Sequence, residues 1–532
     1  MRHKIPRTVP KKQEANSRKL LDLHWSVTKI LDIGWTLKSR ATFKPDLVMS
    51  CNSSEGSSES DREGKKSCKK SKTKENNELM EVDGLEYKNE VYILGRSRPL
   101  EDDEELVMDK SAYRMFFELE VESPSLSFDI ITDNLGFDRC VEVNGEAHSV
   151  CLISGTEAPK DNQNKLVIMR LSNMLPFKRK DSNGDTDSDS EDESDSEGDL
   201  DAEPDVEAAT ILHQGAVNRV RARQHRGRYL AASWSENGLV FIWDLTRPLT
   251  AVNDSAVMAD YVRHNESPSP LFTFNGHGSE GFALDWGTHT NSYGHLATGD
   301  CNGRIYHWTP RSSDWAVSNR AYLGHTDSVE DIQWSPTEPT VFISVSSDHS
   351  IRVWDVRAPI SSGSMLTVPE AHPADINVAS WNKLQALNLL TGGDDGTLRI
   401  WDLRLVYSCY SGKKSNYGSV PAYTHLFDYH KKPITSVEWH PNDAGVFVAT
   451  CEDDQATFWD ISLEQSEQEL KQSNESSSNH EADEEDLGIP VQLLFVHGGQ
   501  TELKEAHWHP QVPGLVFTTA LNGYNVFRTC NI

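Results

Sequence analysis

The chain has 532 residues, with 82 Asp and Glu against 52 Lys and Arg, so that its net charge is −30. This balance excludes a generally basic nucleic-acid binder, and we expect no direct sequence-specific binding of nucleic acid, because such proteins need an excess of cations to displace phosphate counterions. A membrane protein is not expected either, because no run approaches the roughly 18 apolar residues of a spanning helix. The eight cysteines form no Cys-x-x-Cys pair, which favours a reducing, intracellular compartment.

Residues 1–90 are basic and rich in serine, and we expect them to be disordered. The cluster KKSCKKSKTK at 65–74 contains six lysines in ten residues. It is typical of a nuclear localisation signal, and a solvated linker is the alternative. Residues 1–48 also contain scattered Leu, Ile and Trp residues, which indicate either an additional helix or a segment that precedes a natural start at Met49.

Residues 91–124 form the next segment, for which we predict a docking helix. Within 105–129, Leu106, Tyr113 and Phe117 form one apolar stripe at helical spacing. A second stripe consists of Met108, Ala112, Met115 and Leu119. Two apolar faces suit a helix that docks through one side and offers the other to a partner, and burial of both faces is the alternative.

Tryptophan organises the remainder of the chain, residues 125–532. The pairs are Trp286/Trp308, Trp334/Trp354, Trp381/Trp401 and Trp439/Trp459. A His precedes the first Trp of each pair by nine residues, and an Asp usually follows the second. Stretches such as SVEDIQW and SIRVWDV alternate apolar and polar residues between Gly, Asp and Ser turns, which predicts short antiparallel strands.

These repeats resemble the WD-repeat family, in which each repeat supplies the four strands of a propeller blade. Six units begin at His213, His277, His325, His372, His430 and His497. A seventh blade is expected upstream, from SLSFDII (126–132), HSVCLISGT (148–156) and KLVIMRL (165–171), with the C-terminal VFRTC strand pairing beside the upstream strands. We therefore predict an all-β, seven-bladed WD-repeat β-propeller, whose closure removes exposed sheet edges.

The resemblance implies that the signature His, a turn Asp, a strand Ser or Thr and the second Trp form a buried hydrogen-bond network. Asp348, Asp395 and Asp453 each lie six residues before their Trp, which is the position of the turn Asp. Asn237 and Asn302 occupy that position in two other repeats, and this predicts a weaker network in those blades. We interpret these residues as scaffold rather than as catalytic groups.

Patterns typical of enzymes and cofactor sites are weak. GHGSEG (276–281) matches Gly-x-Gly-x-x-Gly, but it opens a β-repeat instead of preceding a helix. His507 and His509 have no Cys or acid at ligand spacing. The sequence contains neither a nucleophile elbow nor a phosphate-binding Gly-Lys-Ser/Thr loop. We expect no enzymatic activity, no cofactor and no metal.

Two acidic segments, 178–208 and 463–489, are expected to interrupt the propeller as disordered loops. Residues 181–207 hold 14 acids and no base, residues 464–486 have a net charge of −8, and EDDEE (101–105) adds five acids, so that these stretches carry −27 together. An inert solubilising loop and a flexible polyanion that captures a cationic protein are the alternatives. Serines with an acid three residues later, the pattern of an acidophilic kinase, are Ser188, Ser190, Ser194 and Ser196.

The entrance of a propeller channel suits the binding of a peptide, and the resemblance places Asn218, Glu280, Glu330 and Asn377 there. Two acids in consecutive blades would favour an Arg or Lys of a partner, and simple solvent exposure is the alternative. The predicted helix before SPSL and the acidic insert before LLFVHGG resemble the histone-chaperone subclass of WD proteins, although LGIP replaces the double proline of that subclass. The resemblance implies a groove for a basic helix. The predicted client-binding residues are Tyr113, Phe116, Phe117, Glu280, Glu330, Asn377, Glu484, Glu485 and Asp486.

Residues 80–532 resemble the glutamate-rich WD-repeat proteins, whose yeast relative is a regulator of ribosome biosynthesis. The resemblance is carried by YILGR (92–96), EELVMD (104–109), the first acidic segment, SEGFALDW (279–286), AHWHP (506–510) and VFRT (526–529). It implies a factor of the nucleus and nucleolus for assembly of the large ribosomal subunit, which acts on pre-ribosomal particles. Its expected client is a basic ribosomal protein, with histones as a further client class.

A different function is kept open by WDVR (354–357) and WDLR (401–404), which end two consecutive repeats. Trp-Asp-x-Arg at this position resembles the docking box of substrate receptors for cullin–RING ubiquitin ligases. Arg357 and Arg404 would then contact the ligase adaptor. The alternative is that basic residues after Trp-Asp are a common feature of such repeats.

Overall fold

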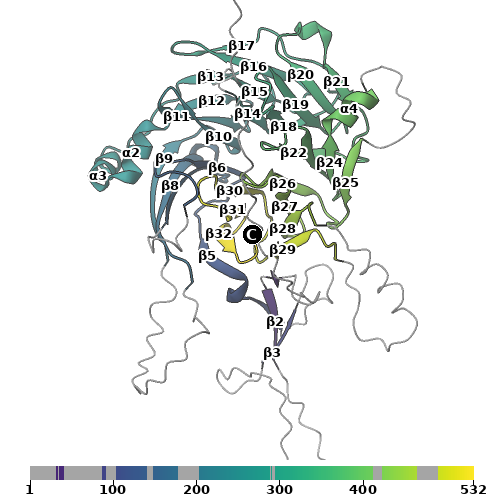
Figure 1. Ribbon diagram of the computed structural model, residues 1–532. Coiled ribbons are helices and arrows are strands. Elements are labelled where there is room, and N and C mark those ends of the chain that lie inside the picture. Colours follow the sequence, from purple (N-terminus) through teal and green to yellow (C-terminus); the bar gives the residue numbers. More distant parts are fainter. Residues whose placement is uncertain are drawn as a thin grey trace, which may run out of the picture.

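The computed structural model describes residues 32–33, 35–40, 87–91, 104–139, 148–177, 203–287, 289, 294–410, 422–463 and 489–532, with side chains from Met108 onward. In this part of the chain, seven antiparallel sheets surround a central channel as the blades of a propeller (Figure 1). The predicted all-β, seven-bladed fold is confirmed. The described part includes no helix with the length and apolar character needed to span a membrane.

The blades follow the chain in order, and the first strand of each lines the central channel. Blade 1 consists of β6 (Ser127–Ile131), β7 (His148–Gly155), β8 (Lys165–Met174) and β9 (Asp205–Leu212). Blade 2 consists of β10 (Val217–His225), β11 (Arg228–Ser235), β12 (Val240–Asp244) and β13 (Phe272–Phe274). Blade 3 consists of β14 (Ala283–Trp286), β15 (Leu296–Gly299), β16 (Ile305–Pro310) and β17 (Trp315–Val317).

The next three blades show the most regular repeats. Blade 4 consists of β18 (Val329–Trp334), β19 (Val341–Ser346), β20 (Ile351–Asp355) and β21 (Leu366–Val368). Blade 5 consists of β22 (Ile376–Trp381), β23 (Asn388–Gly393), β24 (Leu398–Asp402) and β25 (Tyr423–Phe427). Blade 6 consists of β26 (Ile434–Trp439), β27 (Val446–Cys451), β28 (Ala456–Asp460) and β29 (Leu493–His497), and β1 (Asp32–Ile33) pairs in parallel with β29.

Blade 7 closes the ring with strands from both ends of the propeller. It consists of β30 (Glu505–Trp508), β31 (Leu515–Ala520), β32 (Gly523–Thr529) and, as its outer strand, β5 (Tyr113–Leu119). Phe117 is paired with Val526, and Phe116 with Phe527, in the antiparallel register of β5 and β32. The expected pairing of the C-terminal strand with an upstream strand is confirmed, and it leaves no blade without its fourth strand.

The docking helix predicted within residues 91–124 is wrong for the described residues. Residues 104–108 form β4 (Glu104–Met108), a 3-10 turn, η2 (Lys110–Ala112), follows, and β5 occupies the rest of the apolar stretch. Tyr113 and Met115 alternate with less buried residues along β5, and β32 satisfies the backbone of β5. Tyr and Phe favour strands, so the free edge of blade 7 decides a pattern that is also compatible with a helix.

A second, small sheet stands before the propeller in the chain. It has the strand order β3 (Tyr87–Val91), β2 (Trp35–Arg40) and β4, all antiparallel. These strands and β1 fall within or next to the N-terminal segment that we expect to be disordered. The other residues of segment 1–90 lie outside the described residues, and their disorder stays a prediction.

Several insertions separate the third and fourth strands of blades. The helices α2 (Thr246–Asn253) and α3 (Ser255–Arg263) lie between β12 and β13, and α4 (Leu403–Tyr410) follows β24 (Figure 1). Short 3-10 turns are η3 (Asp161–Gln163) and η6 (Ile360–Ser362). Both acidic segments have the same topological position, after β8 in blade 1 and after β28 in blade 6. Most of their residues lie outside the described ranges.

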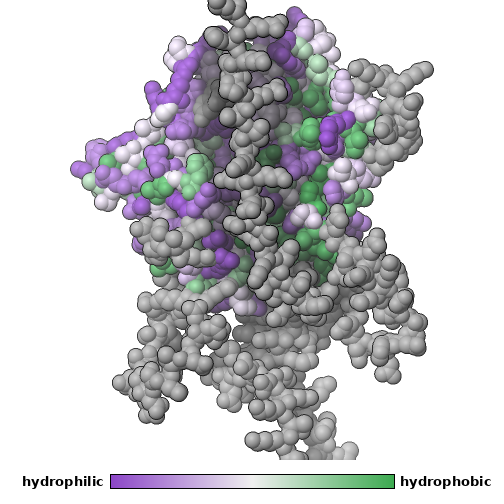
Figure 2. Space-filling model, viewed as in Figure 1, coloured by the Kyte–Doolittle hydropathy of each residue, from purple (hydrophilic) through white to green (hydrophobic). Residues whose placement is uncertain are grey.

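The core lies between the faces of neighbouring blades. In one cluster, Val378, Leu390 and Ile400 of blade 5 pack against Trp439 and Phe447 of blade 6. Each such interface removes large apolar side chains from water, and this burial stabilises the ring. On the surface, apolar residues gather over blades 5 and 6 (right in Figure 2), whereas the region of α2 and α3 is more polar.

Candidate functional site

The signature residues form the expected scaffold network. In blade 4, His325 contacts Asp348 through Nδ1 at 2.9 Å and Ser344 through Nε2 at 2.6 Å, and Trp354 Nε1 donates to Ser344 Oγ at 2.8 Å. Burial lowers the pKa of His325. Burial would raise the pKa of Asp348, but its hydrogen bond with His325 and the charge interaction hold that pKa below its usual range. Blade 5 repeats the network with His372, Asp395, Thr391 and Trp401.

Blade 3 forms the complete network from a different position. His277 contacts Asp300 Oδ2 at 3.0 Å and Thr298 Oγ1 at 2.8 Å. The expectation of a weaker network around Asn302 is therefore wrong for this blade, because the carboxylate stands two residues earlier in the turn. Asp300 is buried, and its Oδ1 also accepts the N–H groups of Asn302 and Arg304.

Blade 2 has no carboxylate in its network. His213 contacts the carbonyl of Gly215 at 2.8 Å and Ser233 Oγ at 3.0 Å. Gly215 has a φ of +81°, and a Cβ there would stand 2.3 Å from the side chain of Asn237. The Asn237 turn thus requires glycine at 215. Burial lowers the pKa of His213 to about 4.

Blade 6 moves the hydroxyl of the network to another strand. Ala449 stands where blade 4 has Ser344, and Thr457 of the neighbouring strand supplies the oxygen. Its Oγ1 contacts His430 Nε2 at 2.9 Å and accepts from Trp459 Nε1 at 2.9 Å. His430 contacts Asp453 at 2.7 Å, so that all four parts of the network are present.

Tyr113, which the sequence assigns to a client-binding surface, belongs to the core instead. Its hydroxyl contacts His497 Nδ1 at 2.8 Å, and Asn525 contacts the other ring nitrogen at 3.1 Å. Tyr113 is 1% exposed. Phe116 packs against Tyr113, and Phe117 is partly buried. We therefore assign Tyr113 to ring closure.

The first tryptophan of each repeat tethers its blade to the preceding one. Trp334 Nε1 donates to the carbonyl of Asp285 at 3.1 Å. Trp286, Trp439 and Trp508 make the same bond to Arg221, Ser380 and Glu438. Trp381 differs, because it donates to Ala386 within its own blade.

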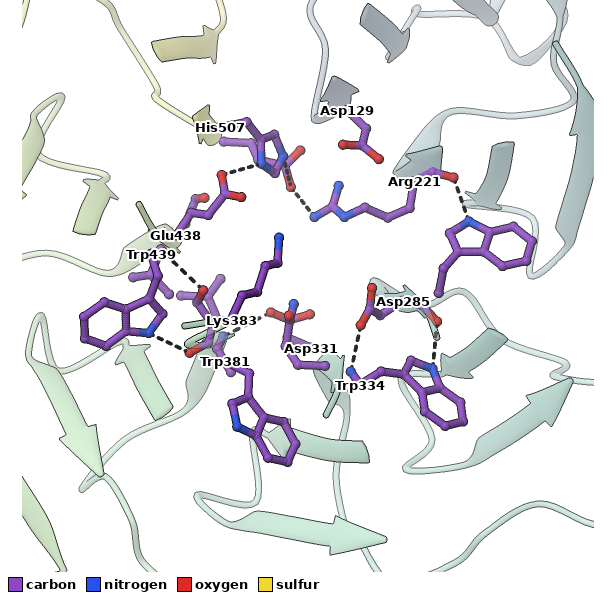
Figure 3. A pocket seen from close by; sticks show the side chains of 18 of the residues that line it. Asp129, Arg221, Asp285, Asp331, Trp334, Trp381, Lys383, Glu438, Trp439 and His507 are labelled. Carbon is purple, nitrogen blue, oxygen red and sulfur yellow. Dashed lines mark hydrogen bonds and ion pairs between the residues drawn. The ribbon is translucent and has the colours of Figure 1, made fainter. Parts of the chain in front are cut away.

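The residue just before this position points into the channel in every blade and forms a seven-membered polar ring (Figure 3). We call this set the inner ring: Asp129, Arg221, Asp285, Gln333, Ser380, Glu438 and His507. It lines a cavity of about 210 Å³, and Lys383 extends over the same space. Four members also join blades, because Asp129, Asp285, Ser380 and Glu438 each accept a backbone N–H from the next blade.

Charge divides the channel into two sectors. On one side, Glu505 accepts from Arg219 at 2.9 Å and from Arg221 at 2.6 Å. His507 contacts Glu438 at 3.0 Å and Glu505 at 3.5 Å. Burial opposes the charge of His507, but the two glutamates raise its pKa to about 9. These groups are mutually compensated.

The other side carries acids without such partners. Asp285 and Asp331 accept backbone N–H groups, and among the described residues neither forms an ion pair. Burial raises the pKa of Asp285 to about 7, with a further contribution from the charge of Asp331, and burial also raises the pKa of Asp331. A cation placed between these carboxylates would relieve an unfavourable burial of negative charge.

The entrance residues extend this acidic sector. Glu330 is the second residue of β18, just before Asp331, and Ser347 donates to it at 3.2 Å. Glu280 is exposed and accepts from Asn218 at 3.3 Å. We call Glu280, Glu330, Asp331 and Asp285 the acidic column. Asn377 is held away from a free role, because it donates to Asp394 at 2.7 Å.

The acidic segments leave from the other face of the propeller. First strands begin at the entrance, so antiparallel third strands end on the opposite face, where β8 and β28 end. The entrance residues and the bases of the acidic segments are therefore separated by the thickness of the ring. Glu484, Glu485, Asp486 and the four candidate phosphoserines lie outside the described residues.

The inner ring is the feature that motif analysis does not identify. Its members differ in every blade, so no common residue type marks them. A positional signal exists, since each stands immediately before the blade-tethering residue, which is Trp in five of the seven blades. Asp285 could have been found in this way from the printed sequence.

The repeated His–hydroxyl–Trp networks and the tethered blades define a WD-repeat propeller protein. The family model described as "WD domain, G-beta repeat" matches residues 317–355, 363–402 and 421–460. A second family model, which describes the histone-binding protein RBBP4 and its counterpart in the CAF1 complex, matches residues 103–175. This range contains β5 and most of blade 1.

Curated relatives match most of the chain. "Glutamate-rich WD repeat-containing protein 1" of Dictyostelium discoideum is 40% identical over 81% of this chain and 83% of its own length. "Ribosome assembly protein rrb1" of Schizosaccharomyces pombe is 38% identical over 80% and 82%. "Protein HEAT STRESS TOLERANT DWD 1" of Arabidopsis thaliana is 40% identical over 81% and 90%. The chain belongs to the family of glutamate-rich WD repeat-containing proteins.

Proposed function

We propose that this chain is a nucleolar factor for assembly of the large ribosomal subunit, which holds a basic ribosomal protein before its incorporation. A relative named as a ribosome assembly protein supports the process. The match to a histone-binding family model supports a basic client, and histones form the second client class. Recognition rests on binding rather than on catalysis.

The acidic column is the observation that carries this proposal. Its four carboxylates extend from the entrance into the channel, and in the described part of the chain none of them forms an ion pair with Lys or Arg. A lysine or arginine of the client that enters beside Glu280 and Glu330 would approach Asp331 and Asp285 in turn. Low local dielectric strengthens such pairs, while their geometry selects an extended basic peptide.

The acidic segments have a complementary role in this account. Ribosomal proteins and histones carry many cations that bind nucleic acid without specificity. A polyanion based on the opposite face shields the parts of the client that do not enter the channel. The shielding by polyanions is screened by salt, whereas the buried pairs of the channel are screened less.

The proposal is tested by binding of purified full-length protein to a basic protein of the large subunit and to histones. Glu280→Gln with Glu330→Gln should weaken binding about tenfold, which corresponds to the loss of two partly exposed ion pairs. Asp314→Asn, on the rim of blade 3, is the matched control because it removes an exposed acid away from the channel. Equal affinity of the entrance variant and the wild type would contradict the proposal.

The native clients can be identified in the same study. Affinity purification of the protein at moderate salt, followed by mass spectrometry, should recover a ribosomal protein of the large subunit or a histone as a direct partner. Nuclease treatment removes partners that are bridged by RNA. Recovery of neither class would remove the support for a chaperone function.

A second candidate function is favoured by the two Trp-Asp-x-Arg sites. Arg357 and Arg404 adopt the same arrangement on neighbouring blades, each donating from Nε and Nη2 to the Asp two residues earlier. Both side chains are 70% exposed, so their outer edges are accessible. A partner that bridges blades 4 and 5, such as a ubiquitin-ligase adaptor, would contact both.

This alternative makes a separate experiment decisive. Arg357→Ala with Arg404→Ala should abolish co-purification of the adaptor if the chain is a substrate receptor. The same variant should keep a basic client soluble if the channel binds it. Loss of client binding in this variant would argue against the separation of the two surfaces.

A further inference from the structure

The first and last blades meet on the face opposite the channel entrance, and four nitrogen-bearing side chains gather there. We call Arg139, His148, His509 and Arg528 the junction site. Arg139 follows β6, His148 begins β7, His509 follows β30 and Arg528 lies in β32. These groups play no part in the channel or in the networks of the blades.

The backbone around the junction site is fixed by Gln511. Its Nε2 donates to the carbonyls of Asp133 at 2.9 Å and Gly136 at 3.1 Å, and its Oε1 accepts from the N–H of Asp133 at 2.8 Å. The N–H of Arg139 donates to the carbonyl of Gln511 at 3.1 Å. The turns that carry Arg139 and His509 therefore hold each other in place.

The two histidines provide unpaired ring nitrogens in the interior. Nδ1 of His509 accepts the N–H groups of Gln511 and Val512, both at 3.1 Å, so its proton resides on Nε2. That Nε2 is buried and has no partner. The Nε2 of His148 is in the same situation. His509 is 1% exposed and His148 is 6% exposed.

The arginines add free donors at the half-buried edge of the site. Nη1 of Arg139 donates to Asp133 at 3.1 Å and to the carbonyl of Ser149 at 3.2 Å. Its Nε and Nη2, the edge that suits an oxyanion bidentately, are buried without a partner. Nε of Arg528 is also unpaired, and it lies 3.4 Å from the position that a Cβ on Gly514 would occupy.

The electrostatic field at the junction site is positive, although the chain carries −30 overall. Burial first, and then the charges of Arg139 and Arg528, lower the pKa of His148 to about 4. Burial, Arg139 and His148 lower the pKa of His509 to about 3. Asp133 forms the ion pair of Arg139. Arg528 forms no ion pair with any described residue, and one carboxylate therefore opposes two guanidinium groups.

We propose that the junction site binds a tetrahedral oxyanion of the phosphoryl class. One water molecule accepts about two hydrogen bonds and cannot satisfy four separate donor groups, whereas a phosphoryl group offers three strong acceptor oxygens and matches the free edge of an arginine. Unpaired buried donors are costly, and such an anion would satisfy them together.

The phosphoryl group has two sources with the same chemistry, inorganic phosphate and a phosphoserine of the first acidic segment. His148 is paired with Met174 at the end of β8, so the chain enters that segment beside the junction site. Ser188 lies eleven residues beyond Phe177, the last described residue there. An extended chain of that length reaches about 36 Å, which is sufficient to return to the site.

The test uses the full-length, phosphatase-treated protein and measures its binding of inorganic phosphate and of synthetic peptides 181–199 by calorimetry. One peptide carries phosphoserine at 188 and 190, and its partner is unmodified. We expect phosphate and the phosphopeptide to bind at one site. A phosphopeptide that binds more tightly than phosphate identifies the segment as the source, and binding of phosphate alone identifies the free ion.

Two variants probe the site by different means. Arg528→Gln should weaken binding of the phosphoryl ligand about tenfold, as expected for the loss of one charge-assisted contact. His509→Asn keeps an acceptor near the position of Nδ1 for Gln511 and Val512 but lacks the Nε2 donor, and should weaken binding about threefold. Arg311→Gln, an exposed arginine on blade 3, removes the same charge elsewhere and should bind as wild type.

Near-ultraviolet circular dichroism of each variant establishes that it is folded, and His509→Asn gives the second reading if Arg528→Gln is not. Wild-type protein that binds neither phosphate nor the phosphopeptide would overturn the proposal. Equal binding by the folded variants, the wild type and the Arg311 control would also overturn it, because that result indicates an adventitious ion only. The outcome does not depend on the client of the channel.

Discussion

The hydroxyl of Tyr113 and Nδ1 of His497 are 2.8 Å apart, although 384 residues separate them in the chain. The bond joins the strand that completes blade 7 to the last strand of blade 6. It also supplies the signature His of the last repeat with a partner inside a buried site. A single tyrosine therefore contributes both to closure of the ring and to the polar network of a blade.

Tyr113→Phe removes this hydroxyl and keeps the ring. We expect the free energy of unfolding to fall by about 1–2 kcal/mol, because His497 loses a partner in a buried site. Urea denaturation followed by tryptophan fluorescence measures the change. Tyr410→Phe, at the partly exposed end of α4, is the control and should remain close to wild type. A loss of client binding without a loss of stability would show that Tyr113 contacts the client after all.

The displaced hydroxyl of blade 6 allows a rescue experiment. Thr457→Val should destabilise the protein by about 1–3 kcal/mol, because His430 and Trp459 both lose the oxygen that they share. Adding Ala449→Ser returns a hydroxyl to the strand that carries it in blade 4, and should recover part of that loss. Failure of the second substitution to recover any stability would contradict the equivalence of the two positions.

Blade 3 offers a direct comparison of two neighbouring turn residues. Asp300→Ala should cost about 3 kcal/mol, because His277 and two backbone N–H groups lose a buried charged acceptor. Asn302→Ala, at the position that the repeat pattern favours, should cost less than about 1 kcal/mol. Thermal denaturation of the two variants decides between these assignments. The reverse order would restore Asn302 as the network residue.

The buried histidines predict that acid destabilises the protein. The pKa values of His213 and His497 are lowered by burial to about 4 and about 3. Between these values and the ordinary pKa of about 6.5, the unfolded chain binds protons that the folded chain does not. The free energy of unfolding should therefore decrease as pH falls from 6.5 to 4, by roughly 1 kcal/mol per pH unit for each such histidine.

Denaturant titrations at pH 7, 6 and 5 test this dependence, with His264→Asn, an exposed histidine of α3's C-terminal cap, as the control that should leave the slope unchanged. His507 acts in the opposite direction, because its raised pKa of about 9 gives a contribution that is lost as pH rises towards that value. Constant or increasing stability on acidification to pH 5 would be inconsistent with neutral buried histidines.

The repeat spacing is sufficient to predict the propeller, because each His and Trp has a structural partner at a fixed strand position. Asp348 and Thr391 follow this rule. Asp300 and Thr457 do not, since a short side chain can reach the same network from an adjacent turn or strand. Spacing therefore locates the network but not always the residue that completes it.

The segment around Tyr113 and the inner ring could not be predicted for different reasons. The sequence of β5 is compatible with two periodicities, and the choice depends on the open edge of β32, which lies some four hundred residues later. Asp285 has no motif of its own, because its environment is created by Asp331 of another blade. Both are properties of the closed ring rather than of a local stretch of sequence.

The central claim is that the acidic column binds a cation of a basic client, and the pH dependence of affinity tests it most directly. Because the pKa of Asp285 is about 7, a bound cation favours the ionised carboxylate, and affinity should rise with pH across this value. The measurement is the dissociation constant of full-length protein and a basic large-subunit ribosomal protein between pH 6 and 8, for the wild type and Asp285→Asn. We predict that the wild type binds about three- to tenfold more tightly at pH 8 than at pH 6, whereas Asp285→Asn, which still accepts from Trp334, binds more weakly and without this dependence. Equal affinity and equal pH dependence of the two proteins would contradict the account.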